Sequence, residues 1–118
     1  MRRVPALFVY GSLMRGQRHA GELGGAEFLG PAHTAPAYTL VDLGDYPGLL
    51  AQGSTAVAGE LYQVSGPHLD LLDAFEEHPD VYRRQEVALA DGRPAQAYLL
   101  VRRPEGVSVV AGGDWRRR

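Results

Sequence analysis

The amino-acid sequence predicts an α+β fold, with a small mixed, mainly antiparallel β-barrel-like sheet and one or two short helices. Three observations support this fold class. The 118 residues suit a single domain, residues 1–118, with a core of its own. Short segments rich in apolar and β-branched residues recur between glycine and proline turns, a pattern typical of strands. Only one segment carries both a helix start signal and a helix stop signal.

Six segments are predicted as strands because turn-forming residues bound each of them. They are residues 4–10, 28–32, 38–42, 57–64, 82–90 and 94–101, and residues 107–115 can add another. Residues 44–48 (Gly-Asp-Tyr-Pro-Gly) are predicted as a loop. Asp91-Gly92 predicts a two-residue type I′ turn joining the fifth and sixth strands. This many short strands in a small chain favours a barrel or a strongly curled sheet.

The predicted helix follows the strand over 57–64. Ser65 is a suitable N-cap residue, and Pro67 is tolerated in the first helical turn. Pro79 should stop the helix. A second, shorter helix is expected over residues 17–23, before a pair of glycines.

The composition excludes several classes of function. All 12 basic residues are arginine, and neither cysteine nor lysine occurs, which excludes disulfides, thiolate metal sites, a cysteine nucleophile and lysine Schiff bases. The formal charge is -2 and the basic residues are scattered, so there is no electrostatic case for nucleic acid. No apolar run approaches the ~20 residues of a membrane-spanning helix. We therefore expect a cytoplasmic protein with no nucleic-acid or membrane partner.

Glu76 occupies an unusual position on the predicted helix. At ~100° per residue, Glu76 falls between Leu72 and Leu69, inside the apolar stripe, whereas Glu77 joins the polar side. Burial of an unpaired carboxylate is costly and raises its pKa toward neutrality, the range in which proton transfer is efficient. The position of Glu76 therefore marks it as a candidate general acid/base.

Two other interpretations of the carboxylates stay open at this point. Glu76 is close to the helix end, so its side chain can bend outward or pair with Arg83 or Arg84. Glu60, in the strand over 57–64, is a second candidate carboxylate, although strand alternation more simply places its side chain outward.

A glycine turn, Tyr10-Gly11-Ser12-Leu13, follows the first predicted strand. Glycine lets the backbone approach a ligand closely, and successive N–H groups at such a turn can hold a carboxylate or an oxyanion. The segment lacks the glycine spacing of a dinucleotide or phosphate loop, and Ser12 lacks the context of a serine nucleophile. Taken alone, the segment is better explained as an ordinary turn.

Aromatic residues and histidines are the remaining candidates for site residues. Tyr46 and Tyr82 could line a pocket, although packing at the edge of the core is the more frequent fate of a strand tyrosine such as Tyr82. The four histidines are dispersed and lack metal-ligand spacing, so no zinc site is predicted.

In combination, these segments resemble the gamma-glutamylcyclotransferase-like family, particularly its short members akin to gamma-glutamylamine cyclotransferase. The similarity spans nearly the whole chain in the family's order. The matching segments are Val9-Tyr10-Gly11-Ser12-Leu13, Gly44-Asp45-Tyr46-Pro47, Val57-Ala58-Gly59-Glu60-Leu61-Tyr62, Leu72-Asp73-Ala74-Phe75-Glu76, Tyr82-Arg83-Arg84 and Gly112-Gly113-Asp114-Trp115. The family fold is a small mixed α/β barrel of about this length.

The resemblance implies an enzyme of acyltransferase or lyase type that needs no metal or cofactor. In this family the α-amine of a small-molecule gamma-glutamyl substrate attacks its own side-chain amide, which releases 5-oxoproline and a free amine. The catalytic glutamate of the family maps onto Glu76, and the substrate-binding loop maps onto Tyr10, Gly11, Ser12 and Leu13. Residues 77–79 vary among members of the family, so gamma-glutamyl amino acids, gamma-glutamylamines and gamma-glutamyl-protected intermediates all remain possible substrates.

Two alternatives to a cyclotransferase stay open. One is a non-catalytic module that binds a small carboxylate or amine in the same pocket, because fold alone does not grant activity. The other is a hydrolase in which water replaces the internal amine. The oligomeric state and the pathway do not follow from the sequence.

Overall fold

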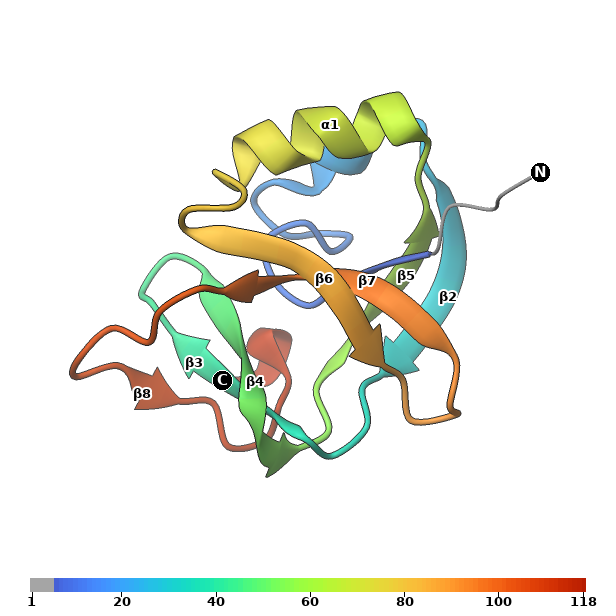
Figure 1. Ribbon diagram of the computed structural model, residues 1–118. Coiled ribbons are helices and arrows are strands. Elements are labelled where there is room, and N and C mark those ends of the chain that lie inside the picture. The colour runs from blue at the N-terminus through green and yellow to red at the C-terminus, as the bar shows by residue number, and fades with distance from the viewer. Residues whose placement is uncertain (1–5) are drawn as a thin grey trace.

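The computed structural model describes residues 6–118, which form two β-sheets, one α-helix and two 3₁₀ turns around a shared core (Figure 1). The elements are β1 (Leu7–Val9), η1 (Ala20–Leu23), β2 (Glu27–His33), β3 (Tyr38–Asp42), β4 (Pro47–Thr55), β5 (Ala58–Gln63), α1 (Gly66–Phe75), β6 (Tyr82–Ala88), β7 (Pro94–Leu100), β8 (Ser108–Val109) and η2 (Trp115–Arg117). Residues 1–5, where the first predicted strand was expected to begin, lie outside the described residues.

The larger sheet has five strands in the order β2-β5-β1-β7-β6. Its central strand, β1, pairs antiparallel with β5 and parallel with β7. Leu7, Phe8 and Val9 are all at most 3% exposed, because β1 is covered on both faces. The mixed but mainly antiparallel sheet agrees with the predicted fold class. The segment after Val9 leaves the centre of the sheet and forms one wall of the candidate site.

The larger sheet is strongly curled, which is one of the two predicted alternatives, and it is not a closed barrel. Its edge strands β2 and β6 approach one another only at one end, where Thr34 and Leu89 form an isolated antiparallel bridge. The strands β4, β3 and β8 form a separate three-stranded sheet. Closure needs a continuous ladder between the edge strands, and the pairing found here is a single bridge.

Strand β4 was not predicted, and residues 44–48 were expected to form a loop. The pairing of Asp42 with Pro47 shows that the loop ends earlier, and β4 continues as the antiparallel partner of β3. In the sequence, the presence of Pro47 and Gly48 argues against a strand at this position. Proline is tolerated here because Pro47 is the first residue of an edge strand. A Cβ atom at Gly48 would lie 2.0 Å from Leu100 Cδ1, so a larger residue there would have to displace the Leu100 side chain.

Helix α1 begins as predicted, since the Ser65 hydroxyl accepts a hydrogen bond from the His68 N–H group at 3.2 Å. It ends at Phe75, before Pro79, and Glu76 is its C-cap. The N–H groups of Glu77 and His78 bond back to the carbonyls of Ala74 and Asp73, which is the Schellman arrangement of a helix end. The helix expected over 17–23 is reduced to the 3₁₀ turn Ala20–Leu23.

The β6–β7 hairpin is present, but its turn differs from the predicted two-residue type I′ turn. Leu89 N–H bonds to the Arg93 carbonyl, and Gly92 N–H bonds to the Leu89 carbonyl, which leaves a three-residue loop. Gly92 has φ of 89°, whereas Asp91 does not have the positive φ that a type I′ turn requires. The Asp-Gly pair therefore supplies a type I turn followed by a glycine bulge.

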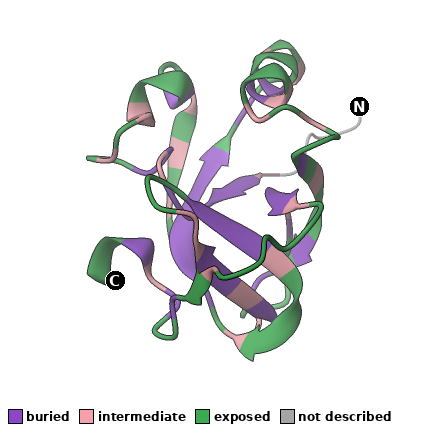
Figure 2. Cartoon of the chain, turned by 90° about the vertical axis from the view of Figure 1, so that its left-hand side faces the viewer, coloured by how far each residue is buried: buried purple, intermediate pink, exposed green. Residues whose placement is uncertain are grey.

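Buried residues concentrate on the strands and on the inner side of α1 (Figure 2). The core includes Trp115, Phe8 and Met14, which are at most 2% exposed. Leu69 and Leu72 of α1 face this core, whereas Leu71 is exposed. No helix within residues 6–118 is long and apolar enough to cross a membrane.

Glu60 is only 4% exposed, so the expected outward orientation of its side chain is wrong. The reason is that β5 lies between β2 and β1 and is buried on both faces, which removes the simple alternation. The Glu60 carboxylate accepts hydrogen bonds from the Arg15 N–H group at 2.9 Å and from the Tyr62 hydroxyl at 3.2 Å. The Arg15 and Arg116 guanidinium groups lie at 3.5 and 3.9 Å from it. These hydrogen bonds and guanidinium groups compensate the burial of the Glu60 carboxylate, which therefore has a structural role.

Candidate active site

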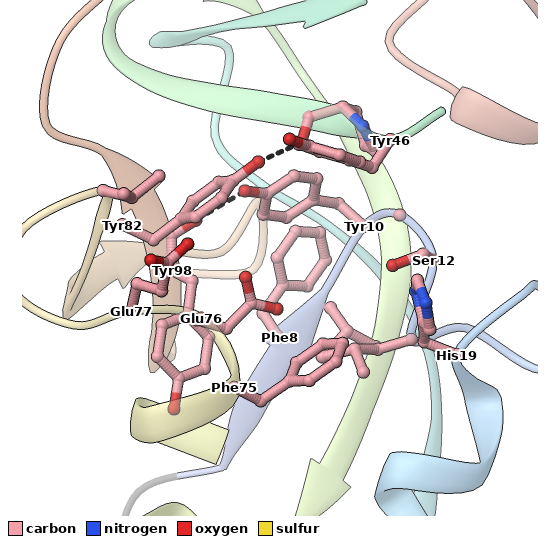
Figure 3. A pocket seen from close by; sticks show the side chains of 15 residues that line it. Phe8, Tyr10, Ser12, His19, Tyr46, Phe75, Glu76, Glu77, Tyr82 and Tyr98 are labelled. Carbon is pink, nitrogen blue, oxygen red and sulfur yellow. Dashed lines mark hydrogen bonds between the residues drawn. The ribbon is translucent and has the colours of Figure 1, made fainter. Parts of the chain in front are cut away.

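One pocket of about 220 Å³ lies between the end of β1, the C-terminal end of α1 and the start of β4 (Figure 3). It brings together residues that are far apart in the sequence. The lining residues are Phe8, Val9, Tyr10, Gly11, Ser12, Leu13, His19, Tyr46, Pro47, Phe75, Glu76, Glu77, Val81, Tyr82 and Tyr98. All seven candidate site residues from the sequence are among them. We call this cavity the candidate pocket.

The glycine turn lines the candidate pocket, and three of its backbone N–H groups have no partner among the described residues. They belong to Gly11, Ser12 and Leu13, which we call the donor loop. The carbonyls of Gly11 and Ser12 accept hydrogen bonds from Met14 and His19 N–H, which fixes the backbone. Successive unpaired N–H groups beside a cavity form a concave anion site. The donor loop can therefore hold a carboxylate or an oxyanion.

Glu76 projects into the candidate pocket from the C-terminal end of α1, and Figure 3 shows its carboxylate between the rings of Phe8, Tyr10 and Phe75. Within residues 6–118 its carboxylate makes neither a hydrogen bond nor an ion pair. Burial in this apolar setting raises the pKa of Glu76 to about 7. Pairing with Arg84, an alternative from the sequence, does not occur, because Arg84 is bonded to Asp73 at 2.8 Å.

The tyrosine hydroxyls of the pocket wall bond to the backbone. The Tyr10 hydroxyl donates to the Tyr98 carbonyl and accepts from Leu49 N–H at 3.2 Å. The Tyr82 hydroxyl donates to the Pro47 carbonyl at 2.8 Å. These bonds join the two sheets beside the pocket. Burial, followed by the neighbouring acidic groups, raises the pKa of both Tyr10 and Tyr82, so both hydroxyls keep their protons.

Sequence reasoning missed the outer wall of the candidate pocket. The ring of His19 meets Phe75 edge-on with centroids 5.2 Å apart, and both residues line the cavity. Phe75 is 39% exposed, and Tyr46, which was proposed as a pocket residue, is 45% exposed at the same mouth. The available sequence signal for this wall was a phenylalanine at the end of the apolar stripe, directly before Glu76. No group of three or more His, Asp or Glu side chains within residues 6–118 could hold a metal ion.

Comparison with known proteins identifies relatives across the whole fold. The family model "Gamma-glutamyl cyclotransferase, AIG2-like" matches residues 7–117. A Vibrio cholerae protein, whose name assigns it provisionally to the gamma-glutamylcyclotransferases, is 38% identical over 112 residues, covering 95% of this chain and 96% of its own. Gamma-glutamylaminecyclotransferase A of Danio rerio is 42% identical over 99 residues, covering 73% of this chain and 62% of its own.

The structural comparison agrees. The crystal structure of an AIG2-like protein from Mus musculus superposes with a TM-score of 0.76 at 29% identity, covering 88% of this chain and 82% of that one. The shared fold, the match over residues 7–117 and the sequence identities all point to one family. The chain belongs to the gamma-glutamyl cyclotransferase, AIG2-like family.

Proposed function

We propose that the protein is a cyclotransferase that cleaves a gamma-glutamyl amide by attack of the substrate's own α-amine, releasing 5-oxoproline and a free amine. Membership of the family supports the reaction class. The observation that carries the proposal is the Glu76 carboxylate, which has a pKa of about 7 and no partner within residues 6–118. It shares one small pocket with Gly11, Ser12 and Leu13, whose N–H groups also have no partner in that part of the chain.

Glu76 acts as the general acid/base in this proposal. The α-ammonium group of the substrate carries three protons and the nitrogen of 5-oxoproline keeps one. Glu76 accepts a proton from the attacking nitrogen and delivers it to the departing nitrogen as the carbon–nitrogen bond of the amide breaks. A second transfer by the same route lets the amine leave as an ammonium ion. A base with a pKa near the working pH suits both directions of transfer.

The donor loop binds substrate oxygens in this proposal. The N–H groups of Gly11, Ser12 and Leu13 can accommodate the α-carboxylate or the oxyanion that forms when the amide carbonyl is attacked. Holding the carboxylate at the donor loop while Glu76 receives the amine proton folds the substrate toward its five-membered ring. Such orientation contributes at least as much to the rate as the proton transfer itself.

The direct test is incubation of the purified protein with a panel of gamma-glutamyl amino acids and gamma-glutamylamines, followed by mass analysis of 5-oxoproline and glutamate. The proposal expects 5-oxoproline. Glutamate in its place would indicate hydrolysis, and tight binding without turnover across the panel would indicate a binding module.

The role of Glu76 is tested by Glu76→Gln, in which the amide cannot accept the proton. We expect kcat to fall by roughly 10²–10⁴-fold, with the fold intact by circular dichroism. Full activity in this variant would remove Glu76 from the mechanism. In the unmodified protein, kcat/KM should rise with increasing pH through about 7, because the ionised carboxylate is the base.

A further inference from the structure

Asp73, three residues before Glu76 on α1, is held by two side chains from the neighbouring hairpin. Its Oδ1 atom accepts a hydrogen bond from the Tyr98 hydroxyl at 2.6 Å and one from Arg84 Nε at 2.8 Å. Its Oδ2 atom accepts a bond from Arg84 Nη2 at 3.1 Å. The Asp73 and Arg84 side chains are only 17% and 22% exposed. A bidentate, partly buried arginine–carboxylate pair fixes orientation more strictly than an exposed ion pair.

The two partners of Asp73 stand in a defined relation to each other. Arg84 in β6 and Tyr98 in β7 are directly opposed residues of the antiparallel ladder. Arg84 is itself oriented by Gln96, whose side-chain oxygen accepts a hydrogen bond from Nη1. Asp73 therefore fastens the end of α1 to a rigid point of the β6–β7 hairpin. We call Asp73, Arg84 and Tyr98 the clamp.

The segment that carries Glu76 is fixed at both of its ends to Arg84. At one end, the Asp73 side chain forms an ion pair with the Arg84 guanidinium group. At the other end, the Nδ1 atom of His78 accepts a hydrogen bond from Arg84 N–H at 3.0 Å. The His78 N–H group also bonds to the Asp73 carbonyl at 2.8 Å. Residues 73–78 thus form a small closed unit, and Glu76 lies inside it.

Tyr98 connects this unit to the opposite wall of the candidate pocket. Its hydroxyl donates to Asp73, while its backbone carbonyl accepts the hydroxyl proton of Tyr10. Tyr10 directly precedes the donor loop. A single residue of β7 is therefore bonded to the helix that carries the acid and to the residue that begins the anion site.

From these contacts we propose that Asp73 is a positioning residue that, through the clamp, sets the place of the Glu76 carboxylate relative to the donor loop. The inference rests on the proposed function in that it assigns Asp73 a part in the same reaction. Partial burial opposes ionisation of Asp73, but the hydrogen bonds from Arg84 and Tyr98 outweigh it and lower its pKa, so the clamp is ionised at neutral pH. By holding Arg84, Asp73 also keeps that cation paired away from Glu76. The other titratable side chains lining the pocket around Glu76 are Tyr10, His19, Tyr46, Glu77, Tyr82 and Tyr98.

Asp73→Asn tests the proposal, with Asp70→Asn as the matched control, because Asp70 is an exposed carboxylate one turn earlier on the same helix. Displacement of a catalytic group by about 1 Å can cost about 10²-fold in rate. We expect Asp73→Asn to lower kcat by roughly 10–100-fold with little change in KM, since the clamp does not contact the donor loop directly. Asp70→Asn should retain the unmodified kcat.

Two further measurements separate positioning from general destabilisation. Tyr98→Phe keeps the Arg84 ion pair and removes one bond of the clamp, so a smaller decrease of kcat in the same direction is expected. Titration of the Glu76 carboxyl carbon by NMR does not depend on activity. We expect its midpoint to move from about 7 toward more acidic pH in Asp73→Asn, because a displaced Glu76 gains solvent and the released Arg84 favours its ionised form.

The outcomes are distinguishable. If the unmodified protein releases no 5-oxoproline, the proposed function fails, and the titration still decides whether Asp73 positions Glu76. If Glu76→Gln is inactive while Asp73→Asn and Tyr98→Phe keep the unmodified kcat and the unmodified Glu76 titration, the positioning role is wrong. If Asp73→Asn does not fold, Tyr98→Phe decides by the same two readouts.

Discussion

A Cβ atom on Gly11 would lie 2.5 Å from the Cγ atom of Pro47, so the donor loop and the first residue of β4 are in direct contact. The backbone of Gly11 has no positive φ, which means that this close approach, and not an unusual turn, requires glycine. Both residues line the candidate pocket.

Replacement of this glycine should therefore act through steric conflict. We expect Gly11→Ala to lower the free energy of unfolding by about 1–3 kcal/mol, the usual range for overpacking, and to lower kcat/KM for a gamma-glutamyl substrate. Urea denaturation and initial rates measure the two effects. Gly21→Ala is the matched control because no atom lies within 4 Å of its Cβ position. Equal effects at the two positions would contradict the steric explanation.

The hydroxyl of Tyr10 joins the two sheets, and its removal should cost stability. Tyr10→Phe leaves Leu49 N–H and the Tyr98 carbonyl without this partner. An unsatisfied buried polar group costs about 1–3 kcal/mol, so the midpoint of urea unfolding should decrease accordingly. Tyr46→Phe, at a 45% exposed position, should stay within about 0.5 kcal/mol of the unmodified protein. A stable Tyr10→Phe variant would show that this bond contributes little.

Burial of Glu76 should make the protein less stable as pH rises. Below pH 4.5, Glu76 is protonated in both the folded and the unfolded states, so its pKa shift has no effect on folding. Between pH 4.5 and about 7 the unfolded chain loses the proton first, which favours unfolding. The loss is complete above the folded-state pKa and amounts to at most about 3 kcal/mol.

Glu76→Gln should remove this loss. We expect its free energy of unfolding to match that of the unmodified protein at pH 4 and to exceed it at pH 8. Chemical denaturation at a series of pH values between these limits gives the difference directly. A difference of the opposite sign at pH 8 would mean that the Glu76 carboxylate is stabilised in the fold.

Glu77 has φ of 54° at the end of α1, a left-handed conformation that costs a residue with a side chain about 1 kcal/mol or more. We expect Glu77→Gly to have a free energy of unfolding about 1 kcal/mol above that of Glu77→Ala. Thermal unfolding of the two variants provides the comparison. If alanine is the more stable substitution, the helix end does not carry this strain.

The sequence predicted the elements whose signals are local. Residues 38–42 form β3 with the predicted bounds, and Ser65 caps α1 as expected. Strand β4 was missed because Pro47, Gly48 and Gly53 weaken its pattern, and only its pairing with β3 reveals it. The predicted orientation of the Glu60 side chain was wrong because strand alternation assumes one solvated face, whereas β5 is covered on both faces.

The candidate site was predictable in part. The helical wheel placed Glu76 inside the apolar stripe, and in the structure Glu76 lines the candidate pocket together with the glycine turn that follows β1. The sequence could not indicate that Arg84 pairs with Asp73 and leaves Glu76 unpaired, because both carboxylates lie within reach along the helix. Nor could it place His19 against Phe75, since that contact joins segments that no periodicity relates.

Tyr46, Phe75 and Val81 all border the mouth of the candidate pocket, and each is between 39% and 45% exposed. Because the side chains of the core and of the clamp lie elsewhere, randomising these three codons would remodel the entrance while leaving the interior intact. Substitutions at these three positions should therefore change which molecules the candidate pocket admits, at little cost in the free energy of unfolding.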